Sequence, residues 1–568
     1  LSGANTYTGG TTINSGTLSV ATGGASGSNL SSGVVTLAGG TLLANTTGNT
    51  ISNSITLSTG TNEIAAATST AVTFSGIISG AGTGALKIGD STNNGTVTLS
   101  GANTYTGGTT INSGTLSVAT GGASGSNLSS GVVTLAGGTL LANTTGNTIS
   151  NSITLSTGTN EIAAATSTAV TFSGIISGAG TGALKIGDST NNGTVTLSGA
   201  NTYTGGTTIN GGTLSLGGST VKIGSLAPYT ITSSPLGTGS ATVTLGTLNL
   251  NGYGLYNPLT LSGTTANAVN LTNASSTTAT VYSNISLTSG INTTNEMSAA
   301  SADSLAIVGI ISSSSATNPS ILVIGDSTNN GTVTLSGANT YTGGTTINGG
   351  TFALTSTGTL GSGTYAGNIS IASGASLLDS SSTAQTLSGV ISGAGSITKD
   401  TGTTTLLLSG ANTLTGGITV NAGTLKIGDV GALGGSAGNI NAVTIGNNGA
   451  LDLNGKAANA YSSLTLNGTG VSSAGALMNS GTAASYAGLV TLGSNASIMG
   501  GSGTITLSNV GTITGATFNL TLGGAQGGSV TSIIGTTTGA LTKQDGGTWT
   551  LSGANTYTGG TTINSGTL

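Results

Sequence analysis

The sequence predicts an all-β fold of the β-solenoid type, an elongated rod of stacked coils with roughly 20 residues in each coil. Three observations predict it: an 18-residue motif recurs along the chain, apolar and hydroxyl residues alternate, and glycine turns interrupt the alternation. Recurrence of this kind is typical of architectures in which each unit buries its apolar face against the next.

The recurring motif reads LSGANTYTGGTTINSGTL. Identical copies span Leu1–Leu18, Leu99–Leu116 and Leu551–Leu568, close variants start at Leu197 and Leu335, and a looser copy starts at Leu408. Residues 1–98 and 99–196 are identical, which indicates a recent duplication.

The motif itself predicts short strands joined by glycine turns. Thr96–Ser100 alternates with period two, Gly107 and Gly108 interrupt it, Thr109–Ile111 starts a second run, and Thr115–Val118 forms a third. Three such segments make about one coil of a solenoid, with apolar side chains inward and Thr or Ser outward.

The segments between the motifs keep the alternation, as in Val34–Ala38 and Asn53–Ser58. We therefore expect one continuous solenoid over residues 1–568, with repeat starts near 1, 99, 197, 335, 408 and 551 and diverged coils over 221–320 and 430–545. The unequal spacing is interpreted as whole coils gained or lost. Pro228, Pro235 and Pro258 predict a loop or irregular coil in the first diverged segment, because proline removes a ladder donor.

Composition narrows the classes of function. Only 3% of the 568 residues are charged, all seven basic residues are Lys, and His and Cys are absent. Seven scattered lysines do not form the basic face that nucleic-acid binding needs, and no apolar run is long enough for a membrane-spanning helix. Because the chain begins and ends inside the motif, we expect an internal fragment whose export signal and anchor lie outside it.

Catalysis has few candidate residues. Without His, Cys or Arg, the usual general bases and thiol nucleophiles are missing, and the twelve acids are scattered. We therefore predict a protein that is not an enzyme, with no catalytic residue and no cofactor. A carbohydrate-active β-helix enzyme stays open as an alternative, because carboxylates one coil apart would still meet in space.

One acidic loop superficially resembles a calcium site. Asp90 is followed by Asn93, Asn94 and Gly95, and the pattern recurs at Asp188 and Asp326. Neither EF-hand spacing nor the nonapeptide of calcium-binding β-rolls is present. An Asn-Gly turn, in which Asp and Asn bind nearby backbone, is the favoured interpretation, and we predict no metal site.

Two motif positions attract attention as candidate sites. The tyrosines would either offer exposed aromatic platforms to sugars or partner surfaces, or pack at a corner over the glycine turn; Leu414 at the equivalent place favours packing. They are Tyr7, Tyr105, Tyr203, Tyr341 and Tyr557. The asparagine is kept even in the loose copy, which predicts a role in satisfying backbone groups inside the coil. These residues are Asn5, Asn103, Asn201, Asn339, Asn412 and Asn555.

The motif text resembles the autotransporter-associated β-strand repeat of passenger regions in bacterial type V secreted proteins. Five copies match in full, and the copy at Leu408 matches loosely because Leu414 replaces the tyrosine. The resemblance implies a right-handed parallel β-helix, displayed on or released from a bacterial outer surface and anchored through a region outside this chain. It further implies adhesion or surface architecture more often than enzymatic activity.

The leading hypothesis is thus a non-enzymatic extracellular solenoid that serves as adhesin, stalk or matrix fibre. Its expected partner is a host or neighbouring-cell surface or glycan, with no nucleic acid and no membrane insertion by this segment. A second alternative is a fibre subunit that associates end to end or laterally, because few charges protect its sheet edges.

Overall fold

The computed structural model describes residues 1–25, 28–80, 82–123, 125–178, 180–223, 230–263, 269–288, 294–315 and 319–568. Over these ranges the chain forms short strands without any α-helix; two 3-10 turns occur, at Gly361–Gly363 and Val471–Ser473. The fold is a parallel β-solenoid, as predicted, with about 23 residues per coil rather than the expected 20. The right-handed sense of the coils stays a prediction.

Backbone contacts divide the chain into two compact units, residues 1–272 and 273–568, and each is described by itself. The single continuous solenoid therefore also stays a prediction. At about 4.8 Å per coil, each unit stacks its coils over roughly 55–60 Å.

Most of the strands that the structure describes in the first unit lie in four ladders, named here by their members. The first contains β1 (Thr11–Ile13), β3 (Val35–Leu37), β6 (Ile55–Leu57) and β9 (Ile78–Ser79). The second contains β2 (Thr17–Val20), β4 (Thr41–Ala44), β7 (Thr61–Ala66), β10 (Ala85–Ile88), β12 (Thr109–Ile111), β14 (Val133–Leu135), β17 (Ile153–Leu155) and β20 (Ile176–Ser177).

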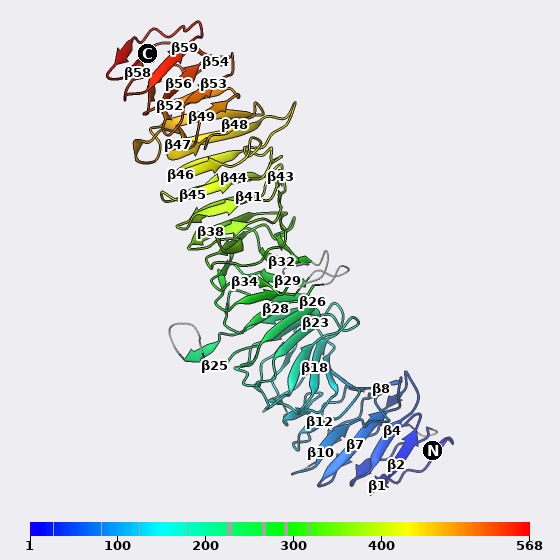
Figure 1. Ribbon diagram of the computed structural model, residues 1–568. Coiled ribbons are helices and arrows are strands. Elements are labelled where there is room, and N and C mark those ends of the chain that lie inside the picture. Colours follow the sequence, from blue (N-terminus) through cyan, green and yellow to red (C-terminus); the bar gives the residue numbers. More distant parts are fainter. Residues whose placement is uncertain are drawn as a thin grey trace. The chain divides into compact units, whose positions relative to one another are not determined.

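The third ladder contains β8 (Ala71–Phe74), on which β5 (Thr50–Ile51) pairs, then β11 (Thr96–Leu99), β13 (Thr115–Val118), β15 (Thr139–Ala142), β18 (Thr159–Ala164), β21 (Ala183–Ile186), the first half of β23 (Thr207–Leu216), β26 (Ala241–Asn249) and β28 (Leu259–Leu261). The fourth contains β16 (Thr148–Ile149), β19 (Ala169–Phe172), β22 (Thr194–Leu197) and the second half of β23. Figure 1 shows these strands lying side by side as successive layers.

Alternation along each strand produces an apolar interior. In the third ladder, Val97, Leu116, Leu140 and Ile162 are successive register partners, and each is at most 1% exposed. Their neighbours along the strand, such as Thr115 and Thr139, point outward. Burying one such aliphatic side chain stabilises the coil by about 1.5–3 kcal/mol.

Within the first unit, successive motif copies do not return to the same ladder. The copy at Leu1 supplies β1 and β2, and the copy at Leu99 supplies β12 and β13. β12 extends the ladder of β2, not that of β1, and the first half of β23 in the next copy likewise extends the ladder of β13. Residues 1–98 therefore span whole coils plus one strand position, a shift called here the one-strand advance. The interpretation of the unequal spacings as whole coils gained or lost concerns the differences between spacings and stays a prediction.

In the second unit, successive motif copies are likewise shifted by one strand position, although the number of residues between copies differs. Its motif ladder runs from β36 (Thr332–Leu335) through β38 (Thr351–Ser356), β41 (Ser376–Ser381) and β44 (Ser396–Lys399) to the first half of β46 (Ile418–Ile427). β38 is the second strand of the copy at Leu335, and β46 begins the strands of the copy at Leu408.

From the second half of β46, a ladder continues through β47 (Asn441–Asp452), β50 (Leu477–Asn479), β52 (Val490–Gly500), β55 (Leu520–Gly523) and β58 (Leu541–Lys543) to β60 (Thr561–Ile563). β60 is the first strand of the copy at Leu551, so the one-strand advance recurs there. The other strands of these coils include β37 (Thr345–Ile347), β40 (Ile369–Ile371), β43 (Ile391–Gly393), β51 (Ala484–Tyr486), β53 (Ile505–Leu507), β54 (Thr512–Ile513), β56 (Gly527–Val530), β57 (Ile533–Ile534) and β59 (Thr548–Leu551).

The first diverged segment leaves the stack where it begins. β24 (Val221–Ile223) pairs antiparallel with β25 (Thr230–Ser233), and this hairpin stands away from the coils of the first unit (Figure 1). An excursion near the prolines was expected; Pro228 lies outside the described residues, whereas Pro235 and Pro258 lie in the connections before β26 and β28. Within the described ranges, no helix has the length and apolar character needed to traverse a bilayer.

Candidate functional sites

The motif asparagine joins coils where the backbone leaves the strand ladder. Asn103 accepts a hydrogen bond from the Ile78 amide at 2.7 Å through Oδ1, and its Nδ2 donates to the Asn127 carbonyl at 2.5 Å. The side chain therefore bridges the coil before it and the coil after it, in place of a strand. It is fully buried, so leaving either backbone group unpaired would cost about 1–3 kcal/mol.

The same bridge recurs at three other copies, while, among the described residues, Asn5 makes only its donating half, to the Asn29 carbonyl, and Asn555 only its accepting half, from the Ile534 amide. Asn201 accepts from the Ile176 amide and donates to the Pro235 carbonyl, and Asn412 accepts from Ile391 and donates to Ala432. Asn339 accepts from the Ile311 amide and donates to the Thr359 carbonyl. The motif asparagine therefore satisfies backbone groups inside the coil, as predicted.

The motif tyrosines lie mostly inside the coils. Tyr105, Tyr203 and Tyr341 have no exposed surface, so in the folded coil they offer no ring to a partner. The Tyr105 hydroxyl hydrogen-bonds with Thr109 Oγ1 at 2.8 Å and donates to the Leu128 carbonyl at 3.2 Å. Burial raises the pKa of Tyr105 to about 12.

Tyr7 and Tyr557 occupy the first and the last described coil and are partly exposed. Tyr7 is 37% exposed, yet it keeps the motif's contacts: its hydroxyl bonds to Thr11 Oγ1 and donates to the Leu30 carbonyl. The Tyr557 hydroxyl lies 2.7 Å from Thr561 Oγ1. All five tyrosines therefore meet the threonine four residues later, and no two of them are brought together.

A tight turn follows the tyrosine, and two glycines are required there. A Cβ on Gly107 would lie 2.2 Å from the Gly84 carbonyl oxygen of the preceding coil, and Gly108 has φ +83°. Only a residue without a side chain fits so close to the neighbouring coil and adopts this φ without strain.

The acidic loop is a self-contained turn. Asp188 Oδ1 accepts hydrogen bonds from the amides of Thr190 and Asn191 and from Thr190 Oγ1, at 2.6–2.7 Å. Burial would raise the pKa of Asp188, but these bonds outweigh it and lower the pKa to about 2. The carboxylates of Asp90 and Asp326 make the same contacts. Within the described ranges, no group of three or more acidic side chains is arranged to hold a metal ion.

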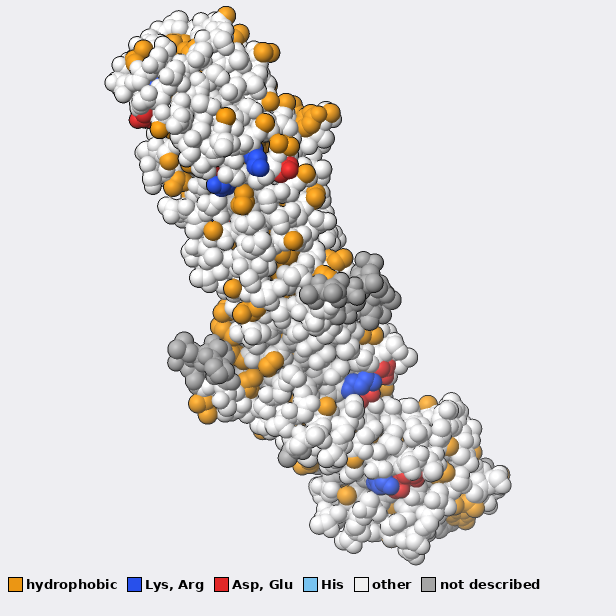
Figure 2. Space-filling model, viewed as in Figure 1, with side chains coloured by type: hydrophobic (Ala, Val, Ile, Leu, Met, Phe, Trp, Pro, Cys, Tyr) orange, Lys and Arg blue, Asp and Glu red, His pale blue; other side chains and the backbone are white. Residues whose placement is uncertain are grey.

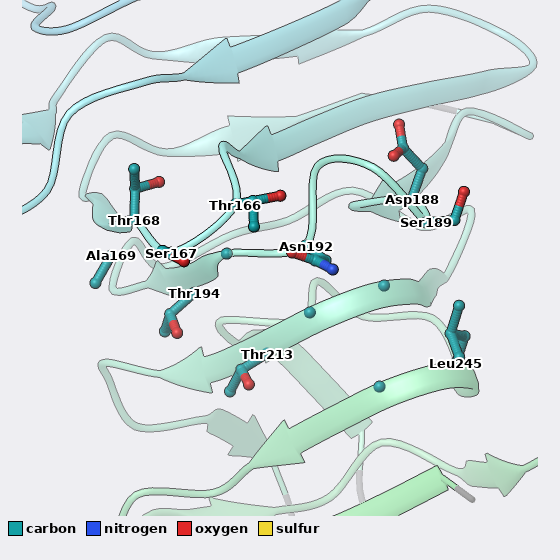
Figure 3. A pocket seen from close by; sticks show the side chains of 14 residues that line it. Thr166, Ser167, Thr168, Ala169, Asp188, Ser189, Asn192, Thr194, Thr213 and Leu245 are labelled. Carbon is teal, nitrogen blue, oxygen red and sulfur yellow. The ribbon is translucent and has the colours of Figure 1, made fainter. Parts of the chain in front are cut away.

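An open groove of about 640 Å³ lies beside this turn in the first unit. Its lining includes Thr166, Asp188, Asn192, Thr213 and Leu245, together with several glycines. Thr194 and Thr213 also line it, and they are register partners on neighbouring strands (Figure 3). Hydroxyl and amide groups there can hydrogen-bond a polar ligand, while the Asp188 carboxylate is already engaged by its own loop.

Charged side chains are sparse on the surface and appear as separate small groups on the face in Figure 2. The sequence reasoning missed that others lie inside the coils: Lys399 and Asp379 are 0% and 2% exposed, with Nζ and Oδ2 3.9 Å apart. Lys543 is fully buried and donates to the carbonyls of Gln544, Asp545 and Ser565. Their inward position in the strand alternation was the available signal, since Ser-Ile-Thr-Lys and Leu-Thr-Lys place the lysine in phase with an apolar residue.

One family model matches the chain, that of the passenger-associated-transport-repeat. It matches at residues 1–20, 91–118, 189–216, 328–354, 400–427 and 541–568, which are the six motif copies and the strands that lead into them. The match at 400–427 includes the loose copy at Leu408. No curated protein and no solved structure matches the chain.

Proposed function

We propose, from the premise that this chain is a passenger region carrying passenger-associated-transport repeats, that it is a non-enzymatic structural and adhesive solenoid of a bacterial cell surface. It would be displayed there or released from it as an adhesin, stalk or matrix fibre. Its partner would be a glycan or protein of a host or neighbouring cell.

The proposal is supported chiefly by the structural role of the repeated residues. Asn103 and Tyr105, the least expected residues of the motif, are buried and bond one coil to the next. A recurring active site would instead place its chemically distinctive residues at the surface. Repetition that reinforces stacking is the property of a structural polymer.

The one-strand advance supports adhesion at many points. Because each copy occupies the ladder next to that of the preceding copy, equivalent outward residues such as Thr12 and Thr110 lie on different ladders of the first unit. A weak contact made by one copy can then be repeated by the others in different directions. Repeated weak contacts raise the overall affinity when they engage together.

The test measures, for the same preparation, binding to cells and glycans and any chemical conversion of those glycans. Beads coated with the purified chain are offered host cells, bacterial cells and a glycan array, and the same glycans are incubated with the chain and analysed by mass spectrometry. We expect binding without any new product. A matched variant, Glu161→Gln with Lys185→Gln and Asp188→Asn, removes charged groups at and near the groove and should bind equally well.

Two results would contradict the proposal. Glycan cleavage that the matched variant abolishes would indicate the carbohydrate-active enzyme. Absence of binding to every cell and glycan, with filaments in negative-stain images at rising protein concentration, would indicate a self-assembling fibre subunit instead.

A further inference from the structure

The groove beside Asp188 is built from the corners of four successive coils of the first unit. Residues 166–169 lead from β18 into β19, residues 189–193 lead from β21 to β22, residues 211–213 belong to β23, and Leu245 belongs to β26. Because successive coils are about 4.8 Å apart, the groove extends over about 14 Å of the stack. A chain molecule lying across several coils fits this length better than a single small ring does.

The groove is open because part of its lining carries no side chain. A Cβ on Gly211 would lie 2.1 Å from the Asp188 carbonyl oxygen, and a Cβ on Gly246 would lie 2.2 Å from the Gly212 carbonyl oxygen. The backbones of successive coils therefore approach each other closely here, which glycine alone permits.

The equivalent corner at the second motif copy is built differently. It has the same acidic turn, but Ser113 stands where the groove has Gly211, and its Oγ donates to the Asp90 carbonyl. By register, Gly137 stands where the groove has Leu245. The groove therefore has an open position and an aliphatic side chain that the earlier corner lacks.

Three side chains of the lining offer free hydrogen-bonding groups. Within the ranges that the structure describes, no protein group hydrogen-bonds the side chain of Asn192, Thr194 or Thr213. The Thr166 hydroxyl, by contrast, donates to the Thr190 carbonyl at 2.6 Å. A ligand with several hydroxyls can bond to all three free side chains, because each of them both donates and accepts.

The lining favours a ligand without charge. Among the described residues that line the groove, Asp188 is the one ionisable side chain. Its Oδ1 and Oδ2 both accept hydrogen bonds from its own loop, the latter from Asn191 Nδ2 at 3.1 Å. An anionic ligand would be repelled by this carboxylate, and a cationic ligand would meet oxygens that are already engaged.

A saccharide fits this lining better than a peptide does. An extended peptide gains affinity mainly by pairing with an exposed strand edge, but β23 already pairs with β22 on one side and with β26 on the other. Leu245 is half-buried and lies apart from Thr194 and Thr213 in Figure 3. The groove thus offers hydroxyl and amide groups for sugar hydroxyls and an aliphatic side chain for the apolar face of a sugar ring.

We propose that this groove binds an uncharged oligosaccharide that lies along the stack of coils. Asn192, Thr194 and Thr213 hydrogen-bond its hydroxyls, and Leu245 packs against one ring. The inference rests on the proposed adhesive function and narrows its partner to a neutral glycan.

The full chain is titrated calorimetrically with oligosaccharides of glucose, mannose, galactose and N-acetylglucosamine, and with sialylated and sulfated oligosaccharides as the charged set. We expect binding to at least one uncharged oligosaccharide and to none of the charged set. Because no charges meet in this complex, its affinity should be the same at low and high salt.

Thr194→Val with Thr213→Val removes two hydroxyls and keeps β-branched side chains, which suit a strand. We expect the affinity to fall on the order of tenfold, since two hydrogen bonds are lost. The matched control is Thr96→Val with Thr115→Val, the register partners at the equivalent corner of the second motif copy, which should bind like the parent chain.

A second variant, Gly211→Ser, introduces the residue that the earlier corner has at Ser113 and should weaken binding by filling the open position. Hydrogen-exchange protection of β22 and β23 should stay at the parent's level in the variants that carry valine, which shows that these coils remain folded.

Equal affinity of the parent and of Thr194→Val with Thr213→Val, or equal losses in the two double variants, would show that the groove is not the site. Binding to charged glycans or to proteins alone would contradict the neutral saccharide. In each of these cases the adhesive function would stand without the groove. A parent chain that binds no cell and no glycan would contradict the adhesive function itself.

Discussion

An ion pair in the duplicated coils of residues 1–196 and an ion pair in the coils after Ser376 lie on opposite sides of their strands. In the duplicated coils the pair of Glu63 and Lys87 stands on the outer surface, with side chains 12% and 27% exposed. In the coils after Ser376, Asp379 and Lys399 are also register partners, but they point into the coil and are almost fully buried.

The comparison shows that the ladder, not the identity of the inward residue, defines this fold. The diverged interior accepts Lys543 because three backbone carbonyls receive its ammonium group. A buried charge is tolerated only where hydrogen bonds and opposite charges compensate the loss of water.

Removing one member of the buried pair should produce the largest effect. Asp379→Ala leaves the Lys399 ammonium group buried without its carboxylate partner, although Nζ still donates to the Thr401 carbonyl. Because an uncompensated buried charge is costly, we expect local stability to fall by about 3–5 kcal/mol. The measurement is the hydrogen-exchange free energy of β41 and β44, because long stacks do not unfold in one step.

The matched change in the duplicated coils is Glu63→Ala, for which we expect a loss of about 0–1 kcal/mol in β7 and β10. Asp379→Leu with Lys399→Leu should recover most of the stability lost by Asp379→Ala. Equal losses at the buried and the outer pair would remove the distinction between the two regions.

An intermediate effect is expected at the asparagine bridge, a buried polar group inside the duplicated coils. Asn103→Ala leaves the Ile78 amide and the Asn127 carbonyl unpaired, so we predict a loss of about 2–4 kcal/mol. Hydrogen exchange of the Ile78 amide reports it directly. Asn112→Ala, an exposed asparagine of the same motif copy, is the control and should change little; comparable losses would show that the bridge is not what joins these coils.

A smaller effect than at the asparagine is expected at the tyrosine hydroxyl, which the loose copy lacks because Leu414 replaces it. Tyr105→Phe removes the bonds to Thr109 and Leu128 but retains the buried ring, and we predict a loss of about 1–2 kcal/mol. Tyr7→Phe, at a partly exposed ring, should cost less. A larger loss at Tyr7 than at Tyr105 would contradict the assignment of burial as the cause.

Much of the fold could be predicted from the sequence because strand alternation and glycine turns are local signals. The parallel coils and the Asn-Gly turn at Asp90 were predicted on that basis. That the motif asparagine satisfies backbone groups was predicted from its presence in the loose copy, but its bridge between coils was not. The coil length was underestimated, since irregular connections such as that between β13 and β14 add residues that contribute no strand.

Other features depend on which residues meet across a coil. Asp379 and Lys399 are one full coil apart in the sequence, and the alternation within each strand does not predict that they lie beside each other. The one-strand advance was missed for the same reason: the text of each motif copy is the same whichever ladder it joins. Packing of the motif tyrosines, Tyr105 among them, was predicted only as the favoured of two alternatives, because Leu414 occupies the equivalent place in the loose copy.

The most direct test of the account is a disulfide between coils at the second motif copy, in a chain that has no cysteine of its own. Lys87 and Thr110 are outward register partners in the structure, whereas a motif that advanced by whole coils would place Thr110 beside Ser79, on the ladder of Thr12, Thr36 and Thr56. Adjacent outward positions in a parallel ladder lie within the Cα separation that a disulfide spans. We predict rapid oxidation of the Lys87→Cys, Thr110→Cys double variant and none of Ser79→Cys with Thr110→Cys. The reverse result would contradict the one-strand advance on which this description of the repeats rests.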